Sequence, residues 1–124
     1  MNEKILVVDG NGEFRELLES FLSRRYEVKT AGNGIEALGM LKNGYMPDLI
    51  VSDNILSPVD GKSFLLQVKE DSRLSHIPAI LITSIYKYVT RADLIRSGAN
   101  DYLVKPFGLS ELDLRIENLL KVTA

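Results

Sequence analysis

Five short runs that read as strands recur along this chain of 124 residues, and a stretch with helical spacing of apolar residues follows each of them. Four of the runs are nearly continuous in apolar residues, which indicates strands buried on both faces, whereas the second run alternates like a short exposed strand. The runs are Lys4–Val8, Tyr26–Thr30, Leu49–Asp53, Ala79–Thr83 and Asp101–Val104. This alternation predicts an α/β fold with one doubly wound, five-stranded parallel sheet.

The stretches between the strands predict five helices. In the first of them five apolar residues recur at the spacing of one helical face, with charged residues between them: Phe14, Leu17, Leu18, Phe21 and Leu22. Ser110 has the character of an N-cap, with an acid three residues later as in a capping box. The expected helices cover Glu13–Arg25, Ile35 to about Asn43, Lys62–Asp71, Tyr88–Gly98 and the region after Ser110.

Composition limits what the chain can be. Hydrophobic residues make up 45% of it, which is enough for one core, so we expect residues 1–124 to form a single domain. The absence of cysteine excludes disulfides, thiolate-bound zinc and thiol catalysis. A net charge of −2 argues against direct nucleic-acid binding, and no stretch has the length of a membrane span. We expect a soluble protein of the cytoplasm.

Polar side chains stand at the ends of the predicted strands. Asp9 follows the first strand and Lys105 follows the last. Asp53 and Thr83 are the final residues of the third and fourth strands. Because the carboxyl ends of parallel strands lie at one edge, we expect these four side chains to converge. Carboxylates suit Mg²⁺, Lys and Thr can hold phosphoryl oxygens, and a carboxylate can itself be phosphorylated. The pattern favours metal-assisted phosphoryl transfer.

Several separated motifs now carry a family resemblance. They are KILVVD with Asp9, LIVSD with Asp53, ILITS with Thr83, and SGANDYLVKPF with Lys105. With these motifs the chain resembles a response-regulator receiver domain, the family that includes the chemotaxis receiver protein. The resemblance implies a flavodoxin-like sheet in the order 2-1-3-4-5 with five helices, and a site between the first and third strands.

The resemblance also implies roles for individual residues. Asp53 would accept a phosphoryl group from the phosphohistidine of a histidine kinase or phosphotransfer protein. Mg²⁺ would be held by Asp9, Asp53 and the backbone carbonyl of Ile55, while Thr83 and Lys105 would contact the phosphoryl group.

Switching is implied as well. Thr83 and Tyr102 would form the switch, and the Lys105–Pro106 bond would be cis. Such a chain is a phosphoacceptor and not an enzyme with an external substrate. Its output would be a downstream protein or output domain, with the chain a monomer or a phosphorylation-linked dimer, and no membrane would be involved.

The chain departs from the family pattern beside its first acid. Gly10 stands where the family usually has a second carboxylate, so Mg²⁺ binding is expected to be weakened. Proline comes one residue late in Leu56-Ser57-Pro58, which predicts a different loop after the phosphoacceptor. Apolar Ile55 and Ile85 offer no polar guide to water, so we expect slow self-dephosphorylation.

Two alternatives remain beside the phosphorylated receiver. Because of Gly10, the chain could be a degenerate receiver, which keeps the fold as a phosphorylation-independent protein-interaction module. A flavin-binding electron carrier on the same sheet order fits less well, because acidic and basic strand ends suit phosphoryl chemistry better. A colourless protein would exclude it.

Overall fold

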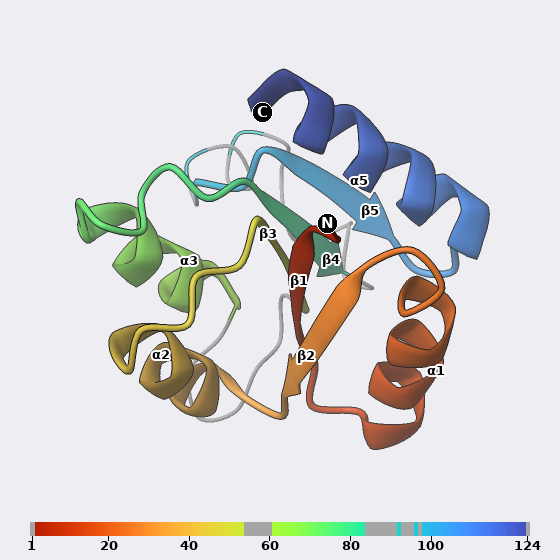
Figure 1. Ribbon diagram of the computed structural model, residues 1–124, viewed down its shortest axis with the longest axis horizontal. Coiled ribbons are helices and arrows are strands. Elements are labelled where there is room, and N and C mark those ends of the chain that lie inside the picture. The colour runs from red at the N-terminus through yellow and green to blue at the C-terminus, as the bar shows by residue number, and fades with distance from the viewer. Residues whose placement is uncertain (1, 54–60, 84–91, 93–95, 97, 124) are drawn as a thin grey trace.

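A computed structural model describes residues 2–53, 61–83, 92, 96 and 98–123 of the chain (Figure 1). Its five strands are β1 (Lys4–Val8), β2 (Glu27–Ala31), β3 (Leu49–Asp53), β4 (Ala79–Thr83) and β5 (Asp101–Val104). All neighbouring pairs are parallel, and the sheet order is β2-β1-β3-β4-β5. This confirms the predicted topology. Four strands have the predicted bounds, and β2 lies one residue later than expected.

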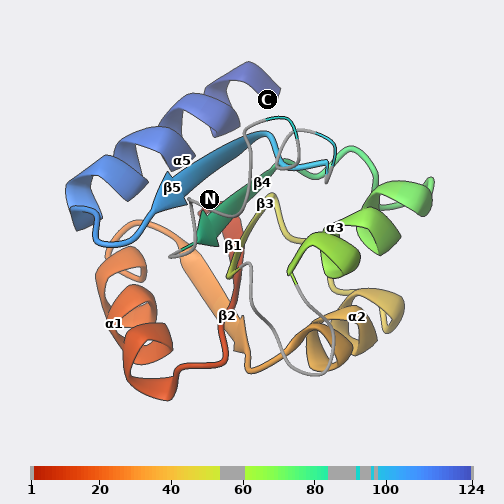
Figure 2. The same cartoon turned by 180° about the vertical axis from the view of Figure 1, so that it is seen from behind.

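Four helices are described around the sheet. They are α1 (Gly12–Leu22), α2 (Gly34–Lys42), α3 (Gly61–Glu70) and α5 (Leu109–Thr123). Helices α1 and α5 lie on one side of the sheet and α2 and α3 on the other, and the reverse view agrees (Figures 1 and 2). The helix predicted over Tyr88–Gly98 falls largely outside the described residues, although Gly98 has the positive φ of 91° suited to a helix stop.

Each strand supplies side chains to two cores. Ile5 and Val7 of β1 pack in one cluster with α1 and α5, whereas Leu6 and Val8 pack in the other with α2 and α3. All four are fully buried. Successive residues of a strand point to opposite faces, so a continuous apolar run is what a sheet covered on both sides requires. The sequence pattern and the layer architecture therefore have the same cause.

Two details of the predicted helices are wrong. Helix α5 begins at Leu109, and the carbonyl of Gly108 accepts the hydrogen bond from the Leu112 amide, so Ser110 lies inside the first turn and is not the N-cap. The acid of the supposed capping box, Asp113, accepts a hydrogen bond from Arg25 instead. Leu17, expected on the inner face of α1, has 49% of its surface exposed.

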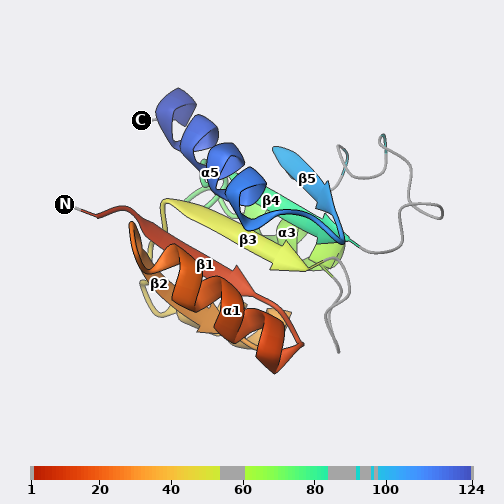
Figure 3. The same cartoon turned by 90° about the vertical axis from the view of Figure 1, so that its right-hand side faces the viewer.

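The loops that follow β1 and β2 are short and end in asparagine caps. The Asn11 side chain accepts a hydrogen bond from the Phe14 amide at the start of α1, and Asn33 accepts one from the Glu36 amide at the start of α2. Both caps satisfy amides that have no partner within the helix. The strand arrowheads point toward one edge, where α1 also begins, and we name it the carboxyl edge (Figure 3).

Candidate functional site

Asp9 follows β1 at the carboxyl edge and is held by its neighbours on several sides. Its amide donates to the Ala31 carbonyl at 3.1 Å, and its own carbonyl accepts from Arg15 Nη1 at 2.7 Å. The carboxylate oxygen Oδ1 accepts from the Asn11 amide at 2.8 Å. The residue is only 1% exposed, and Oδ2 has no hydrogen-bond partner among the described residues. One oxygen of a rigidly held carboxylate thus remains available.

Asp53 ends the neighbouring strand, β3. In the register of β1 and β3, Val8 lies opposite Ser52, so Asp9 and Asp53 come next to each other beyond the paired residues. The Ser52 hydroxyl donates to the Asp53 carbonyl at 3.1 Å. The Asp53 side chain is 17% exposed, more than that of Asp9, and solvent reaches it. Of the two acids, Asp53 is the accessible one.

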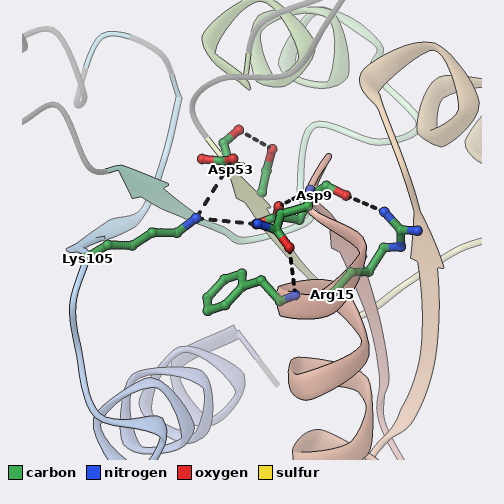
Figure 4. A network of polar contacts seen from close by, with 7 residues as sticks. Asp9, Arg15, Asp53 and Lys105 are labelled. Atoms are coloured by element: carbon green, nitrogen blue, oxygen red, sulfur yellow. Dashed lines mark hydrogen bonds and ion pairs between the residues drawn. The ribbon is translucent and has the colours of Figure 1, made fainter.

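Lys105 completes the arrangement from the end of β5. Its ammonium nitrogen lies 3.7 Å from Asp9 Oδ2 and 4.0 Å from Asp53 Oδ2, so it faces both acids (Figure 4). Its amide donates to the Thr83 carbonyl at 2.8 Å, which ties the start of this loop to the end of β4. The Lys105–Pro106 bond is cis, as expected.

Thr83 is the last residue of β4 and is 1% exposed. It is paired with Val104, the residue before Lys105, so it lies at the same edge as the acids. The other predicted switch residue, Tyr102, lies within β5, where it is half-buried and packs against the core shared with α2 and α3. Ile55 and Ile85, expected to supply a metal contact and to exclude water, lie outside the described residues.

Gly10, which replaces the expected second acid, is exposed at the edge of the site. A Cβ atom at this position would meet nothing closer than the Gly32 carbonyl oxygen at 3.7 Å, an ordinary contact. The adjacent Asn11 does not substitute for the missing carboxylate, because its side-chain oxygen caps α1. The fold therefore has room for an acid at residue 10 that the sequence does not supply.

Two residues near the site were not recognised from the sequence as part of it. The Phe14 ring lies under the Lys105 ammonium, with 4.3 Å from Nζ to the ring centroid, and Arg15 holds the Asp9 carbonyl. The only sequence signal was the short loop after β1, which brings the first turn of α1 to the carboxyl edge. The sequence pattern places Phe14 only on the apolar face of the helix.

The geometry suits a cationic ligand together with an anionic one. Two carboxylates provide hard oxygen ligands, and a buried carboxylate oxygen without a donor is a position that a cation can satisfy. No group of three or more His, Cys, Asp or Glu side chains suited to a metal occurs in the described part of the chain. A lysine ammonium can likewise pair with the oxygens of a phosphoryl group.

Comparisons with known proteins give a consistent result. A family model, the response regulator receiver domain, matches residues 5–117. The probable transcriptional regulator ycf27 of Porphyra purpurea is 38% identical over 120 residues, which cover 96% of this chain and 48% of that protein. Histidine kinase P4 of Formosa agariphila is 35% identical over 117 residues, which cover 94% of this chain and 8% of that protein. The chain spans about half or less of these curated relatives.

A solved structure agrees with the sequence comparisons. It is the receiver domain of a sensor histidine kinase from Pseudomonas aeruginosa, and a magnesium ion is coordinated in its active site cleft. The two chains superimpose with a TM-score of 0.87 at 27% sequence identity, covering 98% of this chain and 99% of that one. Within the described residues of our structure, no helix is long and apolar enough to cross a membrane.

Proposed function

Because the chain belongs to the response regulator receiver domain family, we propose that Asp53 accepts a phosphoryl group from the phosphohistidine of a histidine kinase or phosphotransfer protein. An oxygen of the Asp53 carboxylate attacks phosphorus and forms the new P–O bond. The P–N bond to histidine breaks, and the imidazole leaves with that electron pair and takes up a proton. The product is an aspartyl phosphate.

One observation supports this proposal above all. Lys105 Nζ lies within 4.0 Å of carboxylate oxygens of both Asp9 and Asp53, and these three residues come from the ends of three different strands. An ammonium placed there can stabilise negative charge that develops on a phosphoryl group bound to Asp53. The proposal gives Thr83 a hydrogen bond to the same group, consistent with its place at the end of the adjacent strand.

Magnesium fits the residues that are present, although fewer of them than is usual for the family. Asp9 and Asp53 would hold the ion, with the free oxygen Oδ2 of Asp9 as its first ligand. When bound, Mg²⁺ neutralises negative charge on the phosphoryl oxygens. Glycine at residue 10 removes the second acid of the usual pair and leaves Asp9 and Asp53 as the two carboxylates of the site. We therefore propose that the ion binds more weakly than it would beside an acidic pair.

The proposed output is a change in protein–protein binding. Contacts from the phosphoryl group to Thr83 and Lys105 favour one of two arrangements, and Tyr102 follows that shift as the switch aromatic. The chain acts here as a phosphoacceptor in the cytoplasm and not as an enzyme with an external substrate. The partner is a downstream protein or an output domain, and the chain is a monomer or a phosphorylation-linked dimer.

The direct test is phosphorylation by a small donor. We expect phosphoramidate with Mg²⁺ to add a single phosphoryl group to the wild-type chain, and Asp53→Ala to abolish this uptake, as followed by intact-protein mass. Asp71→Ala is the matched control, because it removes an acid from the loop after α3 whose carboxylate contacts the amide and the guanidinium of Arg73, away from the site. Failure to take up phosphate from any donor or from a cognate kinase would contradict the proposal.

Gly10 favours a second candidate function, a degenerate receiver that binds its partner regardless of phosphorylation. Gly10→Asp separates the two, because its Cβ has room and the new carboxylate restores the acidic pair. If the wild type is an active phosphoacceptor, Gly10→Asp should lower the Mg²⁺ concentration needed for half-maximal phosphorylation by about ten-fold. If only Gly10→Asp becomes phosphorylated, the natural chain is a degenerate receiver.

A further inference from the structure

The two carboxylates do not by themselves fix the position of the Lys105 ammonium. Their oxygens lie 3.7 and 4.0 Å from Nζ, which is longer than a charge-assisted hydrogen bond of about 2.8 Å. The lysine side chain is 28% exposed and has four rotatable bonds, so attraction at this range leaves it several positions. Some other contact must hold the ammonium between the acids.

The aromatic face of Phe14 supplies such a contact. Lys105 Nζ lies 4.3 Å from the ring centroid, well inside the range of about 6 Å over which a ring face attracts a cation. The ring is itself held by Phe107, whose centroid is 6.1 Å away at an interplanar angle of 84°, an edge-to-face pair. Because Phe107 follows Lys105 closely in the chain, one loop carries both the cation and the support for its ring.

We propose that Phe14 is a positioning residue, which holds the Lys105 ammonium beside Asp53 so that it is ready for the phosphoryl group. This inference rests on the proposed function of the site. A ring face attracts the whole ammonium without accepting a particular N–H in a strong hydrogen bond. The three N–H groups of Lys105 therefore stay available to phosphoryl oxygens, whereas hydrogen bonds to carboxylates would have to be broken first.

The alternative role for Phe14 is purely structural, since its ring packs against the core under α1 and α5. The same helix offers a matched control for this role. Phe21 is also partly buried against that core, and a cation, Arg24, lies 5.6 Å from its ring centroid. Phe21 is remote from the acids, so Phe14→Leu and Phe21→Leu remove the same group from comparable packing but only one of them affects Lys105.

The first measurement is the NMR shift of the Lys105 ε-CH₂ protons, which the Phe14 ring current should move upfield. We expect Phe14→Leu to abolish this upfield shift, and Phe14→Tyr and Phe21→Leu to keep it. The second measurement is the rate of phosphorylation by phosphoramidate with Mg²⁺. We expect Phe14→Leu to be slower by about five-fold and Phe14→Tyr to restore the rate.

A third variant isolates ring electrostatics from packing. Trifluorophenylalanine at residue 14 keeps the ring and nearly its volume but weakens its negative face, so it should slow phosphorylation to between the wild-type and Phe14→Leu rates. The inference is overturned if Phe14→Leu leaves the ε-CH₂ shift unchanged, if Phe21→Leu slows the reaction equally, or if the fluorinated ring reacts at the wild-type rate. If wild type is never phosphorylated, the proposed function fails while the ε-CH₂ shift still decides the role of Phe14.

Discussion

Two charged clusters, one on the surface of β5 and α5 and one at the carboxyl edge, differ in how well their members are paired. On the surface of β5 and α5, Arg115 contacts Asp101 at 2.7 Å and Glu111 at 3.4 Å. At the carboxyl edge the corresponding separations from Lys105 are 3.7 and 4.0 Å, although the acids there are more buried. The exposed cluster is satisfied internally, whereas in the buried one Asp9 Oδ2 has no hydrogen-bond partner among the described residues.

The difference supports the proposal that the cluster at the carboxyl edge receives a ligand. Buried polar groups nearly always find hydrogen-bond partners, so Asp9 Oδ2 is an exception that needs a physical reason. Tyr45 Oη is the other such oxygen among the described residues, but it belongs to a neutral phenol, with Lys29 over its ring and Glu27 and Asp48 near enough to help raise its pKa. A buried oxygen without a hydrogen-bond partner indicates a ligand site only when the oxygen is charged and lies beside a second acid and a cation. Asp9 Oδ2 meets this condition, and Tyr45 Oη does not.

The largest expected effect comes from removing the free oxygen of the site. Asp9→Ala should lower Mg²⁺-dependent phosphorylation by about a hundred-fold, which corresponds to about 2.7 kcal/mol of transition-state stabilisation. The increase in Tm caused by Mg²⁺ should disappear with it, a measurement that does not need phosphorylation. Asp101→Ala in the satisfied cluster is the control. Equal losses in both variants would remove the distinction between the clusters.

An effect of intermediate size tests whether the Tyr45 hydroxyl destabilises the fold because it lacks a hydrogen-bond partner. Tyr45→Phe should raise the free energy of unfolding by about 1 kcal/mol at neutral pH, because it removes a buried hydroxyl without a described partner. Chemical denaturation measures this directly. A loss of stability would show that the hydroxyl has a favourable partner.

The same hydroxyl predicts how stability depends on pH. Burial raises the pKa of Tyr45 from 10.0 to about 12, so the unfolded chain ionises first as the pH rises. The ionisation of Tyr45 therefore leaves the free energy of unfolding unchanged below pH 10.0 and lowers it between pH 10.0 and about 12. Because the side chain is partly exposed, we expect a loss of about 1 kcal/mol after solvent screening. Tyr45→Phe should lack this loss in denaturation series across that range.

The smallest effect belongs to the satisfied cluster. Arg115→Ala should lower the free energy of unfolding by about 0.5–1 kcal/mol, as is usual for exposed ion pairs, and less at high salt. The rate of phosphorylation should stay at the wild-type value. A large loss of activity in this variant would mean that the surface cluster takes part in function after all.

The sequence was sufficient to predict that the site residues lie together at one edge of the sheet. Asp9, Asp53, Thr83 and Lys105 were predicted at one edge, because parallel strands bring their carboxyl ends together whatever the side chains do. The strands themselves were predicted to within one residue, since burial on both faces demands continuous apolar runs. Topology carries this part of the prediction.

Contacts that depend on side-chain packing could not be predicted. The approach of Phe14 to Lys105 joins residues far apart in sequence and depends on the rotamers of both. The N-cap assigned to Ser110 was wrong for a related reason. Asp113, its supposed partner in the capping box, accepts hydrogen bonds from Arg25 and Tyr26 in the turn between α1 and β2, contacts that no local pattern reveals.

The open space at Gly10 also has an evolutionary meaning. A glycine codon differs by a single base from a codon for aspartate, and the nearest atom to a new Cβ is the Gly32 oxygen at 3.7 Å. From a GGT or GGC codon, residue 10 can therefore gain an acid in one mutational step, and the new Cβ makes only an ordinary contact. On the function proposed here, selection can then adjust the Mg²⁺ affinity of this domain in either direction while the fold stays the same.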